Sequence, residues 1–298
     1  MMRSLYSGIS GLRNHQTRMD VIANNISNVN TTAFVASRVV FKDVFSQTTK
    51  FASGSSEAVG GTNPIQIGLG VSLATIDMMH SGATALSRSD RSLDFAISGE
   101  GFFIVNTNNA LESPILRFTR AGNFYWDNEG FLVNGDGYFV MGKMLDGAED
   151  ISDPNEAYNG EDVRADDWNG ERADLELING SAFTNIAVDD KGIITGTNEN
   201  GIKVAFGYLV LGTFENTNGL EKVGNSLYRE SNNSGLAKLP VAGDNGAGTI
   251  ATGCLEMSNV DLATEFTDMI VTQRGFQANS RIITTSDSML EELVNLKR

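Results

Sequence analysis

The chain has 298 residues and a formal net charge of −15, from 22 Lys and Arg against 37 Asp and Glu. Its length allows one large or two ordinary domains. Its acidic balance argues against a nucleic-acid partner, because binding of nucleic acid depends on neutralising phosphates. The single cysteine, Cys254, excludes an internal disulfide framework.

The first 30 residues have the repeat of an amphipathic helix. The repeat steps by four and three residues through Leu5, Ile9, Leu12, Gln16, Met19, Ala23 and Ile26. It places one mostly apolar stripe along a helix expected from about Ser4 to about Val29, and such a stripe needs a partner surface. Gly8 and Gly11 lie inside this segment, and each costs roughly 1 kcal/mol relative to alanine. We therefore expect the helix to form only when it is packed.

Residues 34–70 change character. Apolar residues from Phe34 to Phe45 precede a polar stretch rich in Ser, Gly and Thr. This composition predicts an extended linker whose apolar side chains cover a neighbouring surface.

From residue 71 the apolar period falls to two, which is typical of strands. The clearest alternation runs through Val204, Phe206, Tyr208 and Val210. Asn-Gly pairs recur between the predicted strands, and they favour the two-residue turns of antiparallel hairpins. The pairs begin at Asn134, Asn159, Asn169, Asn179, Asn200, Asn218 and Asn245. Residues 71–256 are thus predicted to be β-rich, with an acidic insertion near 145–175.

The C-terminal segment repeats the helical pattern. The repeat passes through Leu262, Phe266, Met269, Gln273, Phe276, Ser280, Ile283, Asp287, Leu290 and Val294. Ser258, three residues before Asp261, indicates a capped start, and the helix would span about 57 Å. The sequence therefore predicts an α+β protein in which residues 1–33 and 257–298 pair as a coiled coil. The alternative, packing of both stripes on the chain's own β domain, would leave much of the last helix overhanging.

Few residues suggest catalysis or metal binding. His15, His80 and Cys254 stand apart in the sequence, so neither cysteine catalysis nor a zinc site is expected. The acidic stretch lacks the spacing of a calcium loop. Two of its carboxylates could serve a glycosidase, but nothing in the sequence selects a pair.

Long segments at both ends resemble the axial proteins of the bacterial flagellum, the rod and hook family. The matching segments are residues 5–34 (LYSGISGLRNHQTRMDVIANNISNVNTTAF) and 258–298 (SNVDLATEFTDMIVTQRGFQANSRIITTSDSMLEELVNLKR). Residues 94–105 and 118–142 resemble the first β domain of the same family. The resemblance implies paired terminal helices that line a channel, a linker that bridges outward, and a β domain that forms an outer tube.

The resemblance also implies a function, which is structural rather than enzymatic and requires no cofactor or metal. The ending QANSRIITTSDSMLEELVNLKR resembles hook proteins more than distal rod proteins. We therefore expect a flagellar hook subunit that polymerises into a curved tubular universal joint and transmits torque from rod to filament. The short chain keeps the distal rod protein of the basal body as an alternative. A more distant alternative is a secreted carbohydrate-active or carbohydrate-binding β-domain protein with helical oligomerisation arms.

Partners and location follow from the same resemblance. The chain would assemble with itself, the distal rod, the hook cap, the hook-filament junction proteins and the flagellar export apparatus, without nucleic acid or direct membrane insertion. It would leave the cell without a cleaved signal peptide for the extracellular hook, which fits a start that lacks an apolar h-region.

The residues expected to form the assembly interface come from the two terminal stripes and from polar and aromatic positions of the matching segments. They are Leu5, Ile9, Leu12, Met19, Ile22, Asn24, Asn25, Ile26, Asn28, Phe34, Leu262, Phe266, Met269, Phe276, Asn279, Ile283, Leu290 and Leu293.

Overall fold

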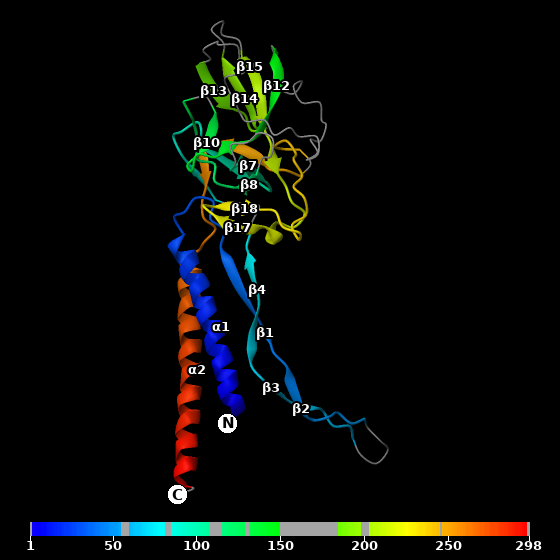
Figure 1. The fold of residues 1–298 in the computed structure, drawn as a ribbon, viewed down its shortest axis with the longest axis vertical. Helices are drawn as coiled ribbons and strands as arrows, with labels where there is room; N and C mark the ends of the chain where they lie inside the picture. Colours follow the sequence, from blue (N-terminus) through cyan, green and yellow to red (C-terminus); the bar gives the residue numbers. More distant parts are fainter. Residues whose placement is uncertain are drawn as a thin grey trace. The chain divides into compact units, whose positions relative to one another are not determined.

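The computed structural model describes residues 2–54, 60–80, 85–107, 115–128, 131–149, 184–197, 203–244 and 246–296. The chain divides into two compact units (Figure 1). The first, here called the helical unit, comprises Met1–Val29, Ala36–Met79 and Val260–Arg298. The second, the β unit, comprises Asn30–Val35 and His80–Asn259. Most of the predicted acidic insertion, residues 150–175, lies outside the described residues.

Among the described residues, the helical unit contains α1 (Met2–Ser27) and α2 (Leu262–Leu296). Asn28 closes α1 by donating to the carbonyl oxygen of Asn24 over 2.9 Å. Asp261 caps α2, because its carboxylate accepts from the Ala263 backbone at 3.0 Å and from the Thr264 hydroxyl at 2.7 Å. These two hydrogen bonds lower the pKa of Asp261, and the bond from Thr264 has the larger effect. The cap is therefore Asp261, not the Ser258 that the sequence indicated.

Two antiparallel ribbons complete the helical unit. The first pairs β1 (Ser37–Asp43) with β4 (Val71–Met78), and the second pairs β2 (Ser46–Lys50) with β3 (Ile65–Gly68). The first ribbon lies against α1, where the Asn14 amide donates to the Val71 carbonyl oxygen at 2.7 Å. Most of residues 37–50 and 65–68, which the sequence assigned to an extended linker, are thus paired strands.

The β unit is built from antiparallel sheets. The largest orders its strands β17-β18-β8-β7-β11-β10-β9, with β16 beside β7, and a second orders them β12-β15-β14-β13. The short pairs β19-β6 and β20-β5 complete the unit. The bounds are β5 (Leu86–Arg88), β6 (Phe95–Ser98), β7 (Phe102–Asn106), β8 (Leu116–Thr119), β9 (Phe124–Trp126), β10 (Leu132–Asn134), β11 (Phe139–Val140), β12 (Gly142–Glu149), β13 (Thr184–Val188), β14 (Ile193–Thr197), β15 (Lys203–Leu209), β16 (Leu211–Gly212), the 3-10 helix η1 (Thr217–Gly219), β17 (Glu221–Gly224), β18 (Leu227–Arg229), β19 (Thr249–Thr252) and β20 (Cys254–Glu256). Two terminal helices and an antiparallel β-structure confirm the predicted α+β class.

The turns differ from those expected. Asn134 ends β10, and its side chain accepts from the backbone N–H groups of Asp136 and Tyr138, so Asn134-Gly135 opens a longer loop. Asn218-Gly219 lies in η1. The two-residue turn with positive φ at both positions is instead Asn225-Ser226, between β17 and β18. The pairs that begin at Asn159, Asn169, Asn179 and Asn200 lie outside the described residues, as does Asn245 of the last pair.

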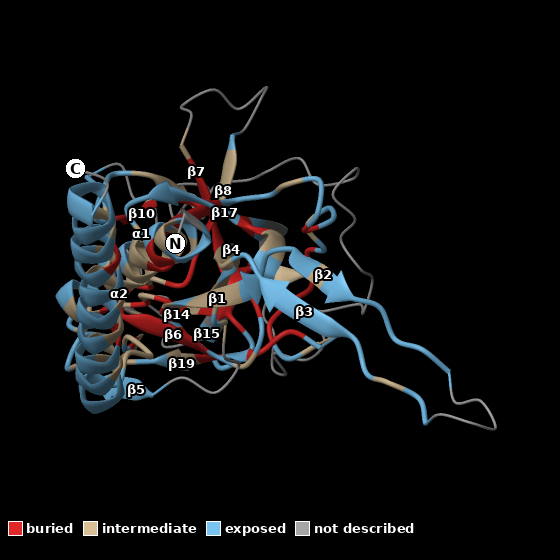
Figure 2. Ribbon diagram, turned by 90° about the horizontal axis from the view of Figure 1, so that it is seen from below, coloured by how far each residue is buried: buried red, intermediate tan, exposed pale blue. Residues whose placement is uncertain are grey.

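The β unit has a dense apolar core. Phe95, Ile97, Phe103 and Leu209 are fully buried, and the rings of Phe103 and Phe124 meet edge to face at 5.2 Å. In Figure 2 the buried residues concentrate on strands such as β6, β7 and β8, whereas α2, β2 and β3 are mainly exposed. The two units therefore differ in how far they cover their own apolar side chains.

Candidate assembly surface

α1 and α2 lie side by side and antiparallel, in very close contact. A Cβ atom at Gly11 would lie 2.6 Å from the Asn279 amide nitrogen, and one at Gly275 would lie 2.7 Å from the His15 ring. Gly8 faces Ile283 near the start of α1. Because glycine lacks a Cβ, these positions let one helix receive the side chains of the other. The glycines that weaken an isolated helix therefore have a packing role.

Polar contacts join the same two helices further along. Arg18 forms an ion pair with Asp268 at 2.8 Å. Asn25 is 2% exposed, and its amide nitrogen donates to Glu265 and to the Ser37 carbonyl oxygen, both at 2.9 Å. Desolvation raises the pKa of Glu265, although its bond with Asn25 opposes this shift. These contacts fix the register of the pair at the end of α1.

The α2 face that meets α1 is mainly small and polar, with Ile283 against Gly8 as an apolar member. Thr272 and Ser286 are its buried residues, next to Gly275 and Asn279. Sequence reasoning included Asn279 and Ile283 but missed Thr272, Gly275 and Ser286, because it followed mainly apolar side chains. Glycines inside the predicted helices, Gly8 and Gly11 in one and Gly275 in the other, are the signal that could have revealed this face.

The predicted interface residues separate by burial. Ile22 and Asn25 are buried, whereas ten others are half-buried and six are exposed. The half-buried residues are Leu5, Leu12, Met19, Ile26, Asn28, Phe34, Met269, Asn279, Ile283 and Leu290. The exposed residues are Ile9, Asn24, Leu262, Phe266, Phe276 and Leu293. Phe34 belongs to the β unit, while the others belong to the helical unit.

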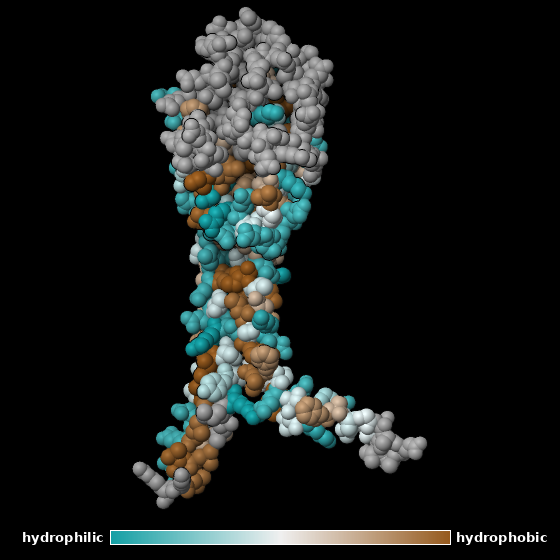
Figure 3. Space-filling model, turned by 45° about the vertical axis from the view of Figure 1, so that its right-hand side comes forward, coloured by the Kyte–Doolittle hydropathy of each residue, from teal (hydrophilic) through white to brown (hydrophobic). Residues whose placement is uncertain are grey.

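α2 carries a large uncovered apolar surface. Phe266 is 50% exposed and Leu293 is 50% exposed. Further exposed side chains that the prediction omitted are Ile270, Val271, Ile282, Met289, Val294 and Leu296. Figure 3 shows this apolar surface towards the C-terminal end of α2, where residues 291–296 are all exposed. Contiguous exposed apolar surface of this kind marks an interaction site.

The β2–β3 ribbon is also uncovered and has two unlike faces. Residues paired across an antiparallel ribbon share a face, so Ile67 lies on the same face as Gln47. Phe45 and Leu69 lie on this face too, where the Leu69 N–H donates to the Phe45 carbonyl oxygen. The other face pairs Ser46 with Gly68. Phe45 is 80% exposed. A two-stranded ribbon with an open apolar face is marginally stable alone in water.

The candidates for chemistry lie elsewhere. His15 packs edge-on against Phe41 in the helical unit, and burial, followed by the charge of Arg18, lowers its pKa. Cys254 is a half-buried free thiol beside a surface pocket lined by Arg88 and Arg91. Among the described residues, no three His, Cys, Asp or Glu side chains gather as metal ligands would. Neither described helix has a stretch apolar and long enough to cross a bilayer.

Comparison with known proteins gives matches at both ends and in the middle of the chain. The family "Flagella basal body rod protein" matches residues 5–34, "Flagellar hook protein FlgE/F/G D1 domain" matches residues 96–196, and "Flagellar basal body rod FlgEFG protein C-terminal" matches residues 251–296.

Relatives match over whole chains. "Flagellar basal-body rod protein FlgG" of Bacillus subtilis (strain 168) is 47% identical over 299 residues, covering all of both chains. "Flagellar hook protein FlgE" of Borreliella burgdorferi is 32% identical over 447 residues, again covering all of both. The FlgG protein of Buchnera aphidicola subsp. Schizaphis graminum is 34% identical over 299 residues, covering 99% of this chain and 100% of that one.

Proposed function

This chain belongs to the family of flagellar axial rod and hook proteins, and on that premise we propose that it polymerises with copies of itself into the hook. The family points to a structural rather than an enzymatic role. A head-to-tail contact whose rotation does not close generates an open helical polymer, which is the geometry that a tube requires.

The exposed apolar surface of the terminal helices supports this proposal most strongly. Within one chain α1 covers the polar face of α2 and leaves Phe266, Phe276 and Leu293 in water. Burying such a side chain contributes about 1.5–3 kcal/mol. In our proposal, helices of neighbouring copies pair as coiled coils over these residues and form the inner wall of the tube. The remaining predicted interface residues join the same contact.

The β unit supplies the outer surface in this proposal. Its described residues already form a dense buried core, and in this proposal its contacts with other copies are polar and weak. Weak outer contacts over a strong inner wall would let a tube bend while it transmits torque.

One observation supports the hook: the closing residues QANSRIITTSDSMLEELVNLKR resemble hook proteins. The Borreliella hook relative at 32% and the Buchnera rod relative at 34% are about equally similar to this chain and do not separate hook from rod. The distal rod is the second candidate, because the Bacillus relative named a rod protein is 47% identical and has nearly the same length. As a hook subunit, the chain would contact the distal rod, the hook cap, the hook-filament junction proteins and the export apparatus.

Electron microscopy of the concentrated full-length chain tests the proposal. Curved tubes support the hook, straight tubes support the rod, and no tubes at any concentration would contradict both. Phe266→Asp should abolish tubes, because it places a charge in the inner wall. Ser288→Asp adds the same charge at an exposed polar position of α2 and should leave tubes intact.

A screen for glycan hydrolysis and glycan binding addresses the remaining alternative. Turnover or saturable binding by a chain that forms no tubes would favour the secreted carbohydrate-active or carbohydrate-binding protein.

A further inference from the structure

His80, which follows the helical-unit segment that ends at Met79, lies in the β unit between two aromatic rings. Its ring centroid is 5.7 Å from that of Phe102 and 5.6 Å from that of Tyr228, and both contacts are edge to face. Both imidazole nitrogens are buried, and neither has a hydrogen-bond partner among the described residues. The site therefore accommodates a neutral imidazole. Among the described residues, it offers no hydrogen-bond acceptor to a protonated ring.

The charges around this aromatic site are mainly positive. Arg120 lies over the Phe102 ring at 5.7 Å and donates to Glu256 at 3.0 Å in a buried ion pair. Lys222 pairs across the β17–β18 hairpin with Tyr228, so the two side chains share a face. Among the described residues, the charged and titratable groups that act on or contact His80 are thus the cations Arg120 and Lys222 and the phenol of Tyr228, while Glu256 pairs with Arg120.

The pKa shifts agree with this geometry. Burial, followed by the charges of Arg120 and Lys222, lowers the pKa of His80 to about 4. Burial, with a further contribution from Glu256, raises the pKa of Tyr228 to about 12. At neutral pH the ring of His80 is therefore neutral and the phenol keeps its proton.

Residues of this cluster contact two segments of the β unit, residues 30–35 and 256–259. The Ala33 N–H donates to the Glu256 carbonyl oxygen at 2.9 Å, and the Asn259 N–H donates to the Phe34 carbonyl oxygen at 3.4 Å. Lys222 donates to the Val35 carbonyl oxygen at 3.1 Å, with its ammonium 4.9 Å from the centre of the Phe34 ring. The two backbone hydrogen bonds thus join residues 30–35 to residues 256–259, and the Lys222 ammonium, one of the two cations that act on His80, holds Val35.

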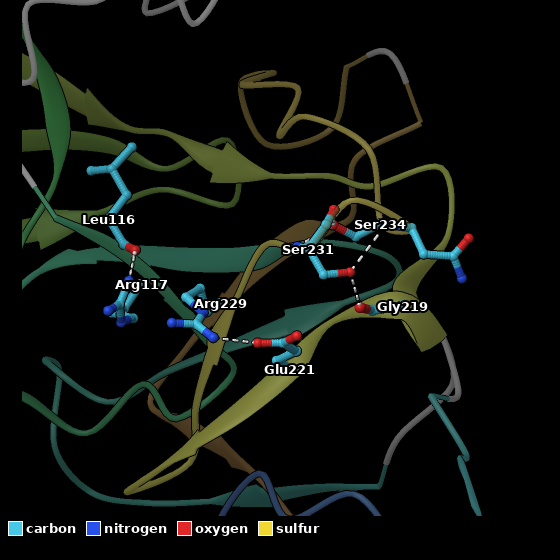
Figure 4. A network of polar contacts seen from close by, with 8 residues as sticks. Leu116, Arg117, Gly219, Glu221, Arg229, Ser231 and Ser234 are labelled. Carbon is cyan, nitrogen blue, oxygen red and sulfur yellow. Dashed lines mark hydrogen bonds and ion pairs between the residues drawn. The ribbon is translucent and has the colours of Figure 1, made fainter. Parts of the chain in front are cut away.

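Further polar contacts fix the hairpin that carries Lys222 and Tyr228. Glu221 and Arg229 form an ion pair on its other face, and the Ser231 hydroxyl donates to the Gly219 carbonyl oxygen at 2.6 Å (Figure 4). Because the hairpin is braced, the aromatic site cannot widen easily to hydrate a charged imidazole.

We propose that His80 is an acid-sensitive latch: a proton taken from solvent by its ring expels it from between Phe102 and Tyr228 and loosens residues 30–35 and 256–259. The folded state prefers the neutral ring, so the stabilisation is complete above pH 6.5, the ordinary pKa of histidine. It is lost as the pH falls from 6.5 towards 4, and it does not change further below 4. The folding equilibrium should fall on the order of 100-fold across this range.

The chain has only two histidines, which makes the test direct. In full-length His15→Gln the single remaining imidazole signal in the NMR spectrum is that of His80, and we expect it to titrate well below pH 6. Titration near 6.5 would overturn the proposal. This measurement leaves His80 intact, so it does not depend on the folding of a variant at that position.

Hydrogen exchange then tests the latch itself. Between pH 6.5 and 4.5 the protection factors of the Ala33 and Asn259 amides should fall, while those in the core strands β7 and β8 should not. His80→Phe fills the same space without a titratable group, and it should keep both amides protected at pH 4.5. Equal loss of protection in His80→Phe, or no loss in the unsubstituted chain, would contradict the latch.

Discussion

The helical unit and the β unit differ in charge and in how they treat apolar side chains. The helical unit has ten Lys and Arg against ten Asp and Glu, whereas the β unit has 12 against 27, so the β unit carries the whole net charge of −15. The β unit buries residues such as Phe95 and Phe103, while the helical unit leaves Phe45 and Phe266 exposed. Among the described residues, the β unit covers most of its large apolar side chains, with exceptions such as Leu236, whereas the helical unit leaves more of them exposed and carries no net charge.

This division suits a protein that must stay soluble before it assembles. Net charge keeps copies apart at long range, and it is located where the proposed contacts are weak. The neutral helical unit can be concentrated in an inner wall without net repulsion. In the proposed function, the β unit therefore keeps copies soluble and the helical unit drives assembly. The following experiments test this division.

Deleting residues 1–29 should have the largest effect. It removes α1 but keeps residues 30–35, which belong to the β unit. We expect a soluble β-rich monomer by light scattering and circular dichroism, with no tubes in electron micrographs. Tubes formed by this truncated chain would show that the β unit drives assembly.

The Glu256→Gln variant should destabilise the β unit by about 3–5 kcal/mol, because it removes the negative charge that opposes the buried Arg120 guanidinium. Urea unfolding followed by tryptophan fluorescence measures the loss. Arg229→Gln breaks the exposed pair with Glu221 and should cost less than about 1 kcal/mol. Equal losses in the two variants would argue against a special role for the buried pair.

Alanine at Gly11 should weaken the contact between α1 and α2 by about 1–3 kcal/mol, since its Cβ would overlap the Asn279 side chain. Helix content of the dilute chain should fall, although alanine is the better helix former. Adding Asn279→Ala should recover part of the loss. If Gly11→Ala raised the helix content, propensity rather than close packing would govern this position.

Salt should have the smallest effect. Raising the ionic strength from 0.01 M to 0.15 M shortens the screening length from about 30 Å to about 8 Å, which weakens repulsion between β units. We expect a severalfold lower critical concentration for assembly, measured by sedimentation. A higher critical concentration in salt would mean that attraction between charges, not apolar contact, holds the copies together.

The sequence predicted the secondary structure better than the contacts. Period alone identified both helices, because an amphipathic repeat such as Leu262, Phe266 and Met269 is a local property. It misjudged how they pair: Gly11 was interpreted through helix propensity, whereas its effect comes from Asn279, 268 positions away. The antiparallel prediction is correct, but the described two-residue turn uses Asn225-Ser226.

Long-range polar contacts could not be predicted. Arg120 and Glu256 are 136 positions apart, and no local pattern links a cation and a carboxylate at that separation. No neighbour of His80 in the sequence is aromatic, so the sequence does not indicate its ring contacts. Its aromatic surroundings come from β7 and β18, which only the fold brings together.

The hydrogen bond between Asn259 and Phe34 joins the end of the long β-unit segment, residues 80–259, to the short segment, residues 30–35. The β unit thus holds together the two points at which the chain leaves α1 and enters α2. The Borreliella relative, aligned with this chain over 447 positions, accommodates a much longer polypeptide. In the proposed tube, extra length inserted in the β unit would change the exterior while the paired helices of the inner wall stay the same.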